Sequence, residues 1–211
     1  MKWRPFLFAV VVLAAGCGDE VVQVPAPVEE PVIEKETDVP SKVNLSSYFL
    51  KDGQIAHFVG EGNEFASYTT RTVWHDDRHV TVYEDNGGTV MARTFRVEDE
   101  RIVVVREEGE QYEDYVPSDG ELESLKPLYT YLQLPLEVGQ SFDGWTVIDD
   151  SSPLETPLQT FDHAVVLEKI GEDGSIVRSY FAEGFGEVKR EFMMDDFIVS
   201  SMIEQIEEPA R

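Results

Sequence analysis

From Leu45 onward, short runs of apolar and β-branched residues alternate with groups of polar residues and glycine. The runs are rich in Val, Thr, Tyr and Phe, which suit the pleated surface of a sheet. Turn residues recur about every ten to twelve positions, as expected for a meander. One of these groups, Asp85-Asn86-Gly87-Gly88, contains an Asn-Gly pair that tolerates the positive φ angles of a tight hairpin turn. No helical stripe of apolar residues extends over twelve positions in this region.

The predicted strands form two groups, separated by a less regular middle part, residues 109–140. The first group contains Gln54–Val59, Phe65–Trp74, Val80–Tyr83, Thr89–Val97 and Arg101–Arg106. The second contains Phe142–Ile148, Ala164–Ile170, Ser175–Ala182, Glu187–Met193 and Phe197–Ile206. In the middle, we expect one or two helical turns at Ser118–Leu125, ended by Pro127, and an edge strand at Leu128–Leu136. The expected fold is all-β: a curved antiparallel meander, as an open barrel or two-layer sandwich, with little helix.

The start of the chain has a different pattern. The basic residues Lys2 and Arg4 precede an apolar run, Phe6–Ala15, and small residues follow it. This order of basic, apolar and small residues is typical of a secretory signal. The run would form a helix of roughly 15 Å, about half the hydrocarbon thickness of a bilayer. We therefore predict a signal peptide at residues 1–16 rather than a permanent membrane span.

The end of this signal, Leu13-Ala14-Ala15-Gly16-Cys17, resembles the lipobox of bacterial lipoproteins. In that class the cysteine thiol carries a diacylglyceryl group, and the chain is cut before the cysteine. Cys17 is the only cysteine in the 211 residues, and a lone cysteine in an exported protein suggests a modified thiol. Two acyl chains, such as palmitate, hold a protein stably at a membrane, whereas one does not. We expect lipidation at Cys17 and a location at the extracytoplasmic face of the cell membrane; the alternative is a chance cysteine after an ordinary signal peptide.

Between the expected anchor and the expected domain, the composition changes. Residues Gly18–Asn44 contain four prolines and seven acidic residues but no aromatic residue. Proline and like charge favour an extended chain, whose limit at about 3.1 Å per residue is roughly 80 Å. We predict a lipid anchor and acidic tether at 17–44, a β-rich domain at 45–206 and a tail at 207–211. The alternative for part of the tether is a first strand at Val21–Val24 that docks on the domain.

The chain is strongly acidic, with 17 basic and 42 acidic residues and a formal charge of −25. Loss of Lys2 and Arg4 with the signal would leave 15 basic residues against 42 acidic ones, a charge of −27. This charge argues against nucleic acid and against anionic lipid surfaces as partners. With one cysteine no internal disulfide is available, so stability must come from packing.

Few groups of residues suggest chemistry. The group His75-Asp76-Asp77-Arg78-His79 has side chains that bind zinc, although a third ligand would come from His57, His163 or a carboxylate. The alternative is a polar turn with two exposed histidines. Asp149-Asp150 and Asp195-Asp196 do not match a calcium loop. The chain contains no G-x-S-x-G, H-E-x-x-H, P-loop or C-x-x-C motif, although folding could still bring a serine near a histidine. We predict no catalytic residue, metal or cofactor.

The aromatic residues of the predicted strands and bends support two interpretations. They form either an ordinary β core or the lining of a groove for an apolar ligand, as a curved sheet can provide. The residues concerned are Phe58, Phe65, Tyr68, Trp74, Tyr83, Phe95, Tyr129, Tyr131, Trp145, Tyr180, Phe181, Phe185 and Phe192.

The segment Tyr180–Lys189 (YFAEGFGEVK) is similar to the Y-x-A-x-G-x-G-x-V-K motif of uncharacterised small lipoproteins of bacilli. Asn63–Tyr68, Asn86–Thr89 and Pro135–Gly139, which precedes Trp145, also resemble that family. The resemblance implies a surface lipoprotein with β-structure in a single-membrane cell. It assigns no catalytic residue.

Our first hypothesis is a non-enzymatic, membrane-anchored domain that binds an unidentified envelope protein or polymer outside the cell. The alternative is a carrier or sensor of an apolar ligand held in the curved sheet, and an enzyme comes third. A binding module predicts a filled interior, a carrier predicts an apolar cavity, and an enzyme predicts a cleft where titratable residues converge.

Overall fold

The computed structural model describes residues 43–209, which contain twelve strands, one short α-helix and one 3-10 helix. The all-β prediction is therefore confirmed. The predicted signal peptide, Cys17 and nearly all of the predicted tether lie outside the described residues. Within the described range, no helix has the length and apolar character needed to cross a membrane.

The elements have the following bounds, in chain order. The first half contains η1 (Leu45–Tyr48), β1 (Ile55–Glu61), β2 (Tyr68–Trp74), β3 (His79–Asp85), β4 (Val90–Val97), β5 (Arg101–Glu108), α1 (Asp119–Ser124) and β6 (Tyr129–Gln133). The second half contains β7 (Ser141–Phe142), β8 (Trp145–Glu155), β9 (Thr160–Ile170), β10 (Ile176–Ala182), β11 (Gly186–Met194) and β12 (Phe197–Glu207).

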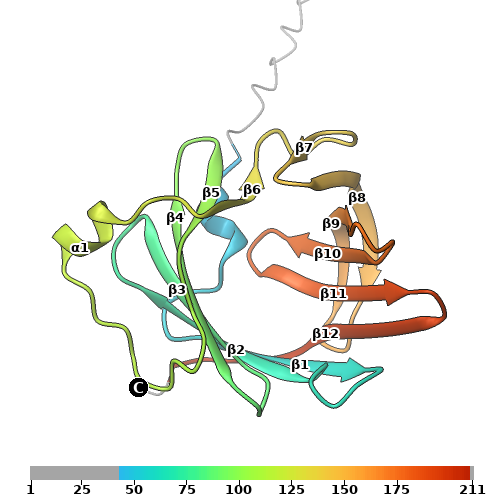
Figure 1. Cartoon of the computed structure of the whole chain (residues 1–211), viewed down its shortest axis with the longest axis horizontal. Helices are drawn as coiled ribbons and strands as arrows, with labels where there is room; N and C mark the ends of the chain where they lie inside the picture. Colours follow the sequence, from blue (N-terminus) through green and yellow to red (C-terminus); the bar gives the residue numbers. More distant parts are fainter. Residues whose placement is uncertain (1–42, 210–211) are drawn as a thin grey trace, which may run out of the picture. The chain divides into compact units, whose positions relative to one another are not determined.

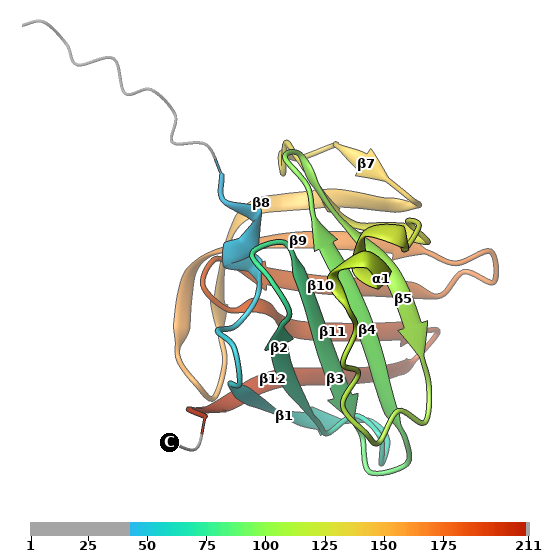
Figure 2. The ribbon, with the colours of Figure 1, turned by 90° about the vertical axis from the view of Figure 1, so that its left-hand side faces the viewer.

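All twelve strands of the described region belong to one antiparallel sheet, in the order β6-β5-β4-β3-β2-β1-β12-β11-β10-β9-β8-β7. The first and last strands pair in the middle of the sheet, and its two edges are β6 and β7, which follow one another along the chain. The sheet curls so that β2–β5 face β8–β11 across an interior (Figure 1). Figure 2 shows that the strands of these two walls cross at a steep angle. The result is a curved meander that remains open between β6 and β7.

The local predictions hold in most places. Tyr129–Gln133 is an edge strand, as expected. The helix α1 begins after Ser118, whose side chain accepts a hydrogen bond from the Glu121 backbone N–H, and it ends before Pro127. The strand predicted at Phe142–Ile148 is instead divided, because Asp143 and Gly144 form a turn between β7 and β8.

The segment Leu45–Leu50, which precedes β1, enters the interior between the two walls. The ring of Phe49 packs against Phe95, with centroids 5.1 Å apart, and edge-on against Trp74 at 5.8 Å. The indole Nε1 of Trp74 donates to the backbone oxygen of Leu50 at 3.0 Å. On the other wall, the backbone N–H of Gly184 donates to the oxygen of Ser47 at 2.7 Å. This segment therefore connects both walls and fills one part of the core.

The residues between β5 and β6 cover the outer face of β3–β5, as α1 does in Figure 2. The Tyr115 backbone N–H donates to the Tyr83 hydroxyl at 2.7 Å, and Leu122 of α1 is almost fully buried. Both faces of this wall are therefore shielded from solvent, which explains why β5 reads as a continuous apolar run from Ile102 to Val105.

Candidate functional site

The interior of the sheet holds a cavity of about 250 Å³. Most of its wall is apolar, with Phe49, Phe58, Phe95, Trp145 and Phe181 among the lining residues. At about 30 Å³ per water molecule, the space corresponds to roughly eight waters. An apolar cavity of about 150 Å³ accommodates benzene, so this one is large enough for a ring-sized molecule and too small for a two-chain lipid.

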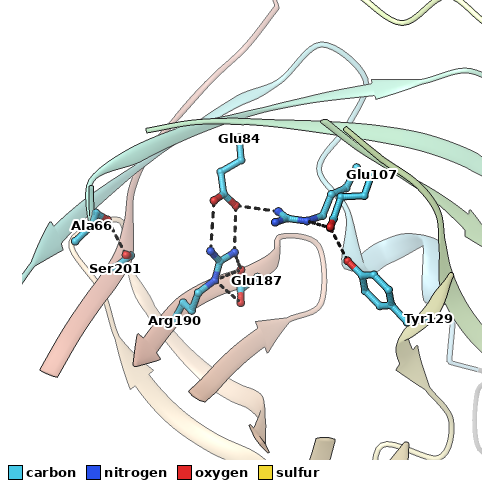
Figure 3. Close-up of polar contacts among 8 residues, drawn as sticks. Ala66, Glu84, Glu107, Tyr129, Glu187, Arg190 and Ser201 are labelled. Carbon is cyan, nitrogen blue, oxygen red and sulfur yellow. Dashed lines mark hydrogen bonds and ion pairs between the residues drawn. The ribbon is translucent and has the colours of Figure 1, made fainter. Parts of the chain in front are cut away.

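One part of the cavity wall is charged. Arg190 of β11 donates from Nη2 to Glu84 of β3 at 3.2 Å, and its Nε and Nη2 bind the carboxylate of Glu187 (Figure 3). Arg93 of β4 donates from Nε to Glu107 of β5 at 2.7 Å and from Nη1 to Glu84 at 3.4 Å. We call Glu84, Arg93, Glu107, Glu187 and Arg190 the interior ion cluster. Because Glu84 and Arg190 come from facing walls, the cluster connects the two halves of the sheet.

Glu84, Arg93, Glu187 and Arg190 of the ion cluster line the cavity, whereas Glu107 is exposed. Protein atoms surround Arg190, yet 35% of its side-chain surface is accessible, because that surface lines the cavity. Glu84 is more enclosed, with 17% of its side chain accessible. Burial acts to raise the pKa of Glu84, but Arg190 and Arg93 outweigh burial, and the pKa falls below its usual value. Burial acts to lower the pKa of Arg190, and the neighbouring Glu187, Tyr68 and Glu84 hold it well above its usual value.

At one end of the cluster, the Tyr129 hydroxyl donates to Glu107 at 2.7 Å (Figure 3). This hydrogen bond, together with Arg93, lowers the pKa of Glu107 despite its partial burial. Burial and the bond to Glu107 raise the pKa of Tyr129 to about 12. With these pKa shifts, Glu84, Glu107, Arg93 and Arg190 are charged near neutral pH and Tyr129 is uncharged.

Two further phenols line the cavity beside the ion cluster. Tyr68 is only 6% exposed, its ring stacks on Phe58 with centroids 4.4 Å apart, and the Arg190 guanidinium lies 5.4 Å from its ring centroid. The Tyr68 hydroxyl is buried and has no hydrogen-bond partner. Tyr131 packs edge-on against Phe181, with centroids 5.4 Å apart. Burial raises the pKa of both Tyr68 and Tyr131, so both hydroxyls remain able to donate.

The candidate metal site at the β2–β3 turn has a different structure from either interpretation. His79 is fully buried, and its Nδ1 lies 2.8 Å from Asp76 Oδ2, so the expectation of two exposed histidines is wrong for His79. His75 instead bonds Thr81, with Nε2 2.7 Å from Oγ1, and burial lowers the pKa of His75. Across residues 43–209, no three His, Cys, Asp or Glu side chains converge as a metal site would require.

The remaining histidines lie elsewhere. His57 pairs with Glu207 at 3.0 Å where β1 meets β12. His163 Nδ1 lies 2.7 Å from the Ser151 hydroxyl, so folding does bring a serine beside a histidine. Asp149 accepts a hydrogen bond from the Ser151 backbone N–H. A nucleophilic site needs a third group that orients the histidine, and the Asp149 contact serves the backbone of the serine instead.

The aromatic residues divide between the cavity and other places. Those that line the cavity are Phe58, Tyr68, Phe95, Tyr129, Tyr131, Trp145, Phe181 and Phe185. Tyr83 lies on the outer face of its wall, and Phe65 is exposed. The structure therefore brings most of the predicted aromatic set together around one space.

Sequence reasoning did not identify the ion cluster. Its members resembled solvent-exposed charges in a very acidic chain. A usable signal was present in β3 and β4. Glu84 lies an even number of positions from the inward-facing Val80 and Val82, and Arg93 lies two positions from Phe95. Since side chains alternate between the two faces of a strand, a charge at such a position predicts an inward-facing ion.

Comparison of the chain with protein-family models and with curated proteins gives no match. Among solved structures, it is similar to the crystal structure of a Bacteroides fragilis protein described as a "putative exported protein with YmcC-like fold". The sequences are 12% identical, the match covers 76% of this chain and 98% of that chain, and the TM-score is 0.47. At this distance, the likeness carries no conclusion about function.

Proposed function

We propose that this protein is a lipid-anchored, extracytoplasmic binding protein that holds a small molecule inside its curved sheet. The interior cavity, with aromatic rings on one part of its wall and the ion cluster on another, is the observation that carries the proposal. The location rests on the signal-like and lipobox-like residues 1–17.

The cavity favours the carrier hypothesis over the surface-binding one. A surface-binding module requires only a filled core, whereas this interior retains about 250 Å³ between its walls. The cavity is not wholly apolar, because Glu84, Arg93 and Arg190 reach it. A molecule with an apolar ring and a polar group suits such a wall better than a hydrocarbon does.

Binding suits the charged wall better than catalysis does. A general acid or base works best with a pKa near the operating pH. The pKa of Glu84 is lowered and that of Arg190 is raised, so both move away from neutrality. Each charge of the cluster is already paired with another.

Native mass spectrometry of the gently purified full chain, paired with solvent extraction, tests the proposal. We expect a co-purifying mass of a small organic molecule. Thr70 lines the cavity and its neighbour Thr69 does not, so Thr70→Leu should reduce the bound fraction and Thr69→Leu should leave it unchanged. A clean ligand-free mass for the wild-type protein would instead favour the surface-binding hypothesis.

The anchor is tested separately. The Cys17→Ala variant should lose incorporation of a labelled fatty acid and should remain uncut or be released from the membrane. Continued labelling of that variant would refute the lipoprotein assignment without affecting the cavity.

A further inference from the structure

One polar atom of a residue that lines the cavity lacks the partner that its burial demands. Tyr68 is 6% exposed, lines the cavity, and its hydroxyl has no hydrogen-bond partner. Nearly all buried polar groups in folded proteins are hydrogen-bonded to protein or to an ordered molecule. The phenol can both donate and accept, so a hydroxyl or a carbonyl group in the cavity would satisfy it.

Every charged group of the interior ion cluster beside this hydroxyl already has an ion-pair partner. Arg190 uses all three of its guanidinium nitrogens on Glu84 and Glu187, and Arg93 bonds Glu84 and Glu107. A ligand carboxylate would have to compete with these glutamates, and a ligand ammonium with these arginines. A charge that enters an enclosed site without its own partner is strongly disfavoured. The cluster therefore selects against charged ligands.

The size and the aromatic wall define the rest of the ligand. The Tyr68 ring already stacks on Phe58 with an interplanar angle of 14°, and the cavity volume of about 250 Å³ exceeds that of a benzene site only moderately. We propose that the cavity takes an uncharged, ring-sized molecule with a hydroxyl or carbonyl group, which hydrogen-bonds the Tyr68 hydroxyl. This inference rests on the proposed function and specifies the ligand class.

Isothermal titration calorimetry on the purified full chain with four matched probes tests it: benzene, phenol, benzoate and benzylamine. All four contain one benzene ring; at neutral pH phenol adds an uncharged hydroxyl group, benzoate is an anion and benzylamine is a cation. We expect phenol to bind about three- to tenfold more tightly than benzene, as one net hydrogen bond provides. Benzoate and benzylamine should bind more weakly than benzene.

The Tyr68→Phe variant removes only the hydroxyl. It should reduce phenol affinity to that of benzene, and leave benzene affinity unchanged. The control is Tyr83→Phe, because Tyr83 is equally buried, at 5% exposure, but its hydroxyl binds the Tyr115 backbone outside the cavity. This control should leave the preference for phenol intact.

The outcomes separate the two proposals. Equal affinities for phenol and benzene, or tighter binding of either charged probe, would overturn the ligand class while leaving a binding cavity. Failure of all four probes to bind would refute the ligand class and would count against the proposed function. If a small molecule nevertheless co-purifies with the protein, the proposed function stands and only the ligand class is refuted. If Tyr68→Phe does not fold, the affinities of the wild-type protein for the four probes still test the proposed ligand class.

Discussion

Removal of the Arg190 guanidinium, by Arg190→Met, is the sharpest test of the interior ion cluster. At an effective dielectric constant of about 20, two unit charges 3.2 Å apart, as Arg190 and Glu84 are, attract by roughly 5 kcal/mol. Desolvation of the charges offsets part of this attraction. Without Arg190, Glu187 loses its partner and Glu84 keeps only Arg93.

Loss of one partner from a buried ion pair typically lowers the free energy of unfolding by about 3–5 kcal/mol. Because 35% of the Arg190 side chain faces the cavity, water there will partly solvate the orphaned carboxylates. We therefore expect a loss of about 2–3 kcal/mol at neutral pH. Urea unfolding followed by tryptophan fluorescence measures it.

The loss should depend on pH with a defined sign. Arg190 helps to lower the pKa of Glu84 in the folded protein, so the stabilisation is complete above the unfolded-state pKa of glutamate, near 4.5. It disappears as the pH falls through the lowered folded-state pKa. The variant and the wild type should therefore differ less at about pH 3.5 than at about pH 7.

The control is Arg178→Met. Arg178 has the same 35% side-chain exposure but pairs with one carboxylate, Glu168 at 2.8 Å, on the sheet surface. Its loss should lower the free energy of unfolding by less than about 1 kcal/mol. A cost for Arg190→Met no larger than that of the control, or one that is the same at both pH values, would refute the role of the ion cluster.

Two further predictions concern the entering segment and the open side of the sheet. Gly186 and Gly184 have similar φ angles, +84° and +85°. A Cβ atom added at Gly186 would lie 2.6 Å from the Tyr48 backbone oxygen, whereas one added at Gly184 would meet no atom within 4 Å. In urea unfolding, Gly186→Ala should therefore lower the free energy of unfolding by about 1–3 kcal/mol more than Gly184→Ala does. Equal costs would contradict the close approach. Asp143 accepts a hydrogen bond from the Thr130 backbone N–H, which lowers the pKa of Asp143, so the Thr130 amide signal in NMR spectra should titrate below pH 3.8. This hydrogen bond stabilises the fold at neutral pH and is lost as the pH falls through the lowered pKa of Asp143. A titration midpoint of the Thr130 amide signal at or above pH 3.8 would show that the bond does not form.

Local patterns predicted most strands because the alternation of side chains is a local property. The prediction failed in the second half of β8, where Asp149, Asp150, Ser151 and Ser152 stand in sequence. There the pairing with β9 shifts register between Val147 and Asp149, and twice more before Leu154. Each shift breaks the period of two, so the strand has no recognisable alternation in sequence.

Local sequence patterns could not predict the pairing of β1 with β12 or the assembly of the ion cluster. Both depend on contacts between residues far apart in the chain, such as Glu84 with Arg190, which are 106 positions apart. Composition also concealed the cluster, because three glutamates are inconspicuous among 42 acidic residues. The two interpretations of the aromatic residues, core and lining, both apply, because residues such as Phe95 and Phe181 pack in the core and also line the cavity. Ring size and strand position together favour the interior for such residues.

The pairing of the first strand with the last has a consequence for how the protein reaches its folded state. Apart from β5 and β6, which the longer segment 109–128 connects, neighbouring strands of each half form hairpins with short loops, and such hairpins form quickly. The contact between His57 and Glu207 spans 150 residues, so the two halves can join only once the final strand is available for pairing. Until then β1 presents a bare hydrogen-bonding edge. A chain that stops short of β12 would keep that edge exposed and would be prone to pair with other strands.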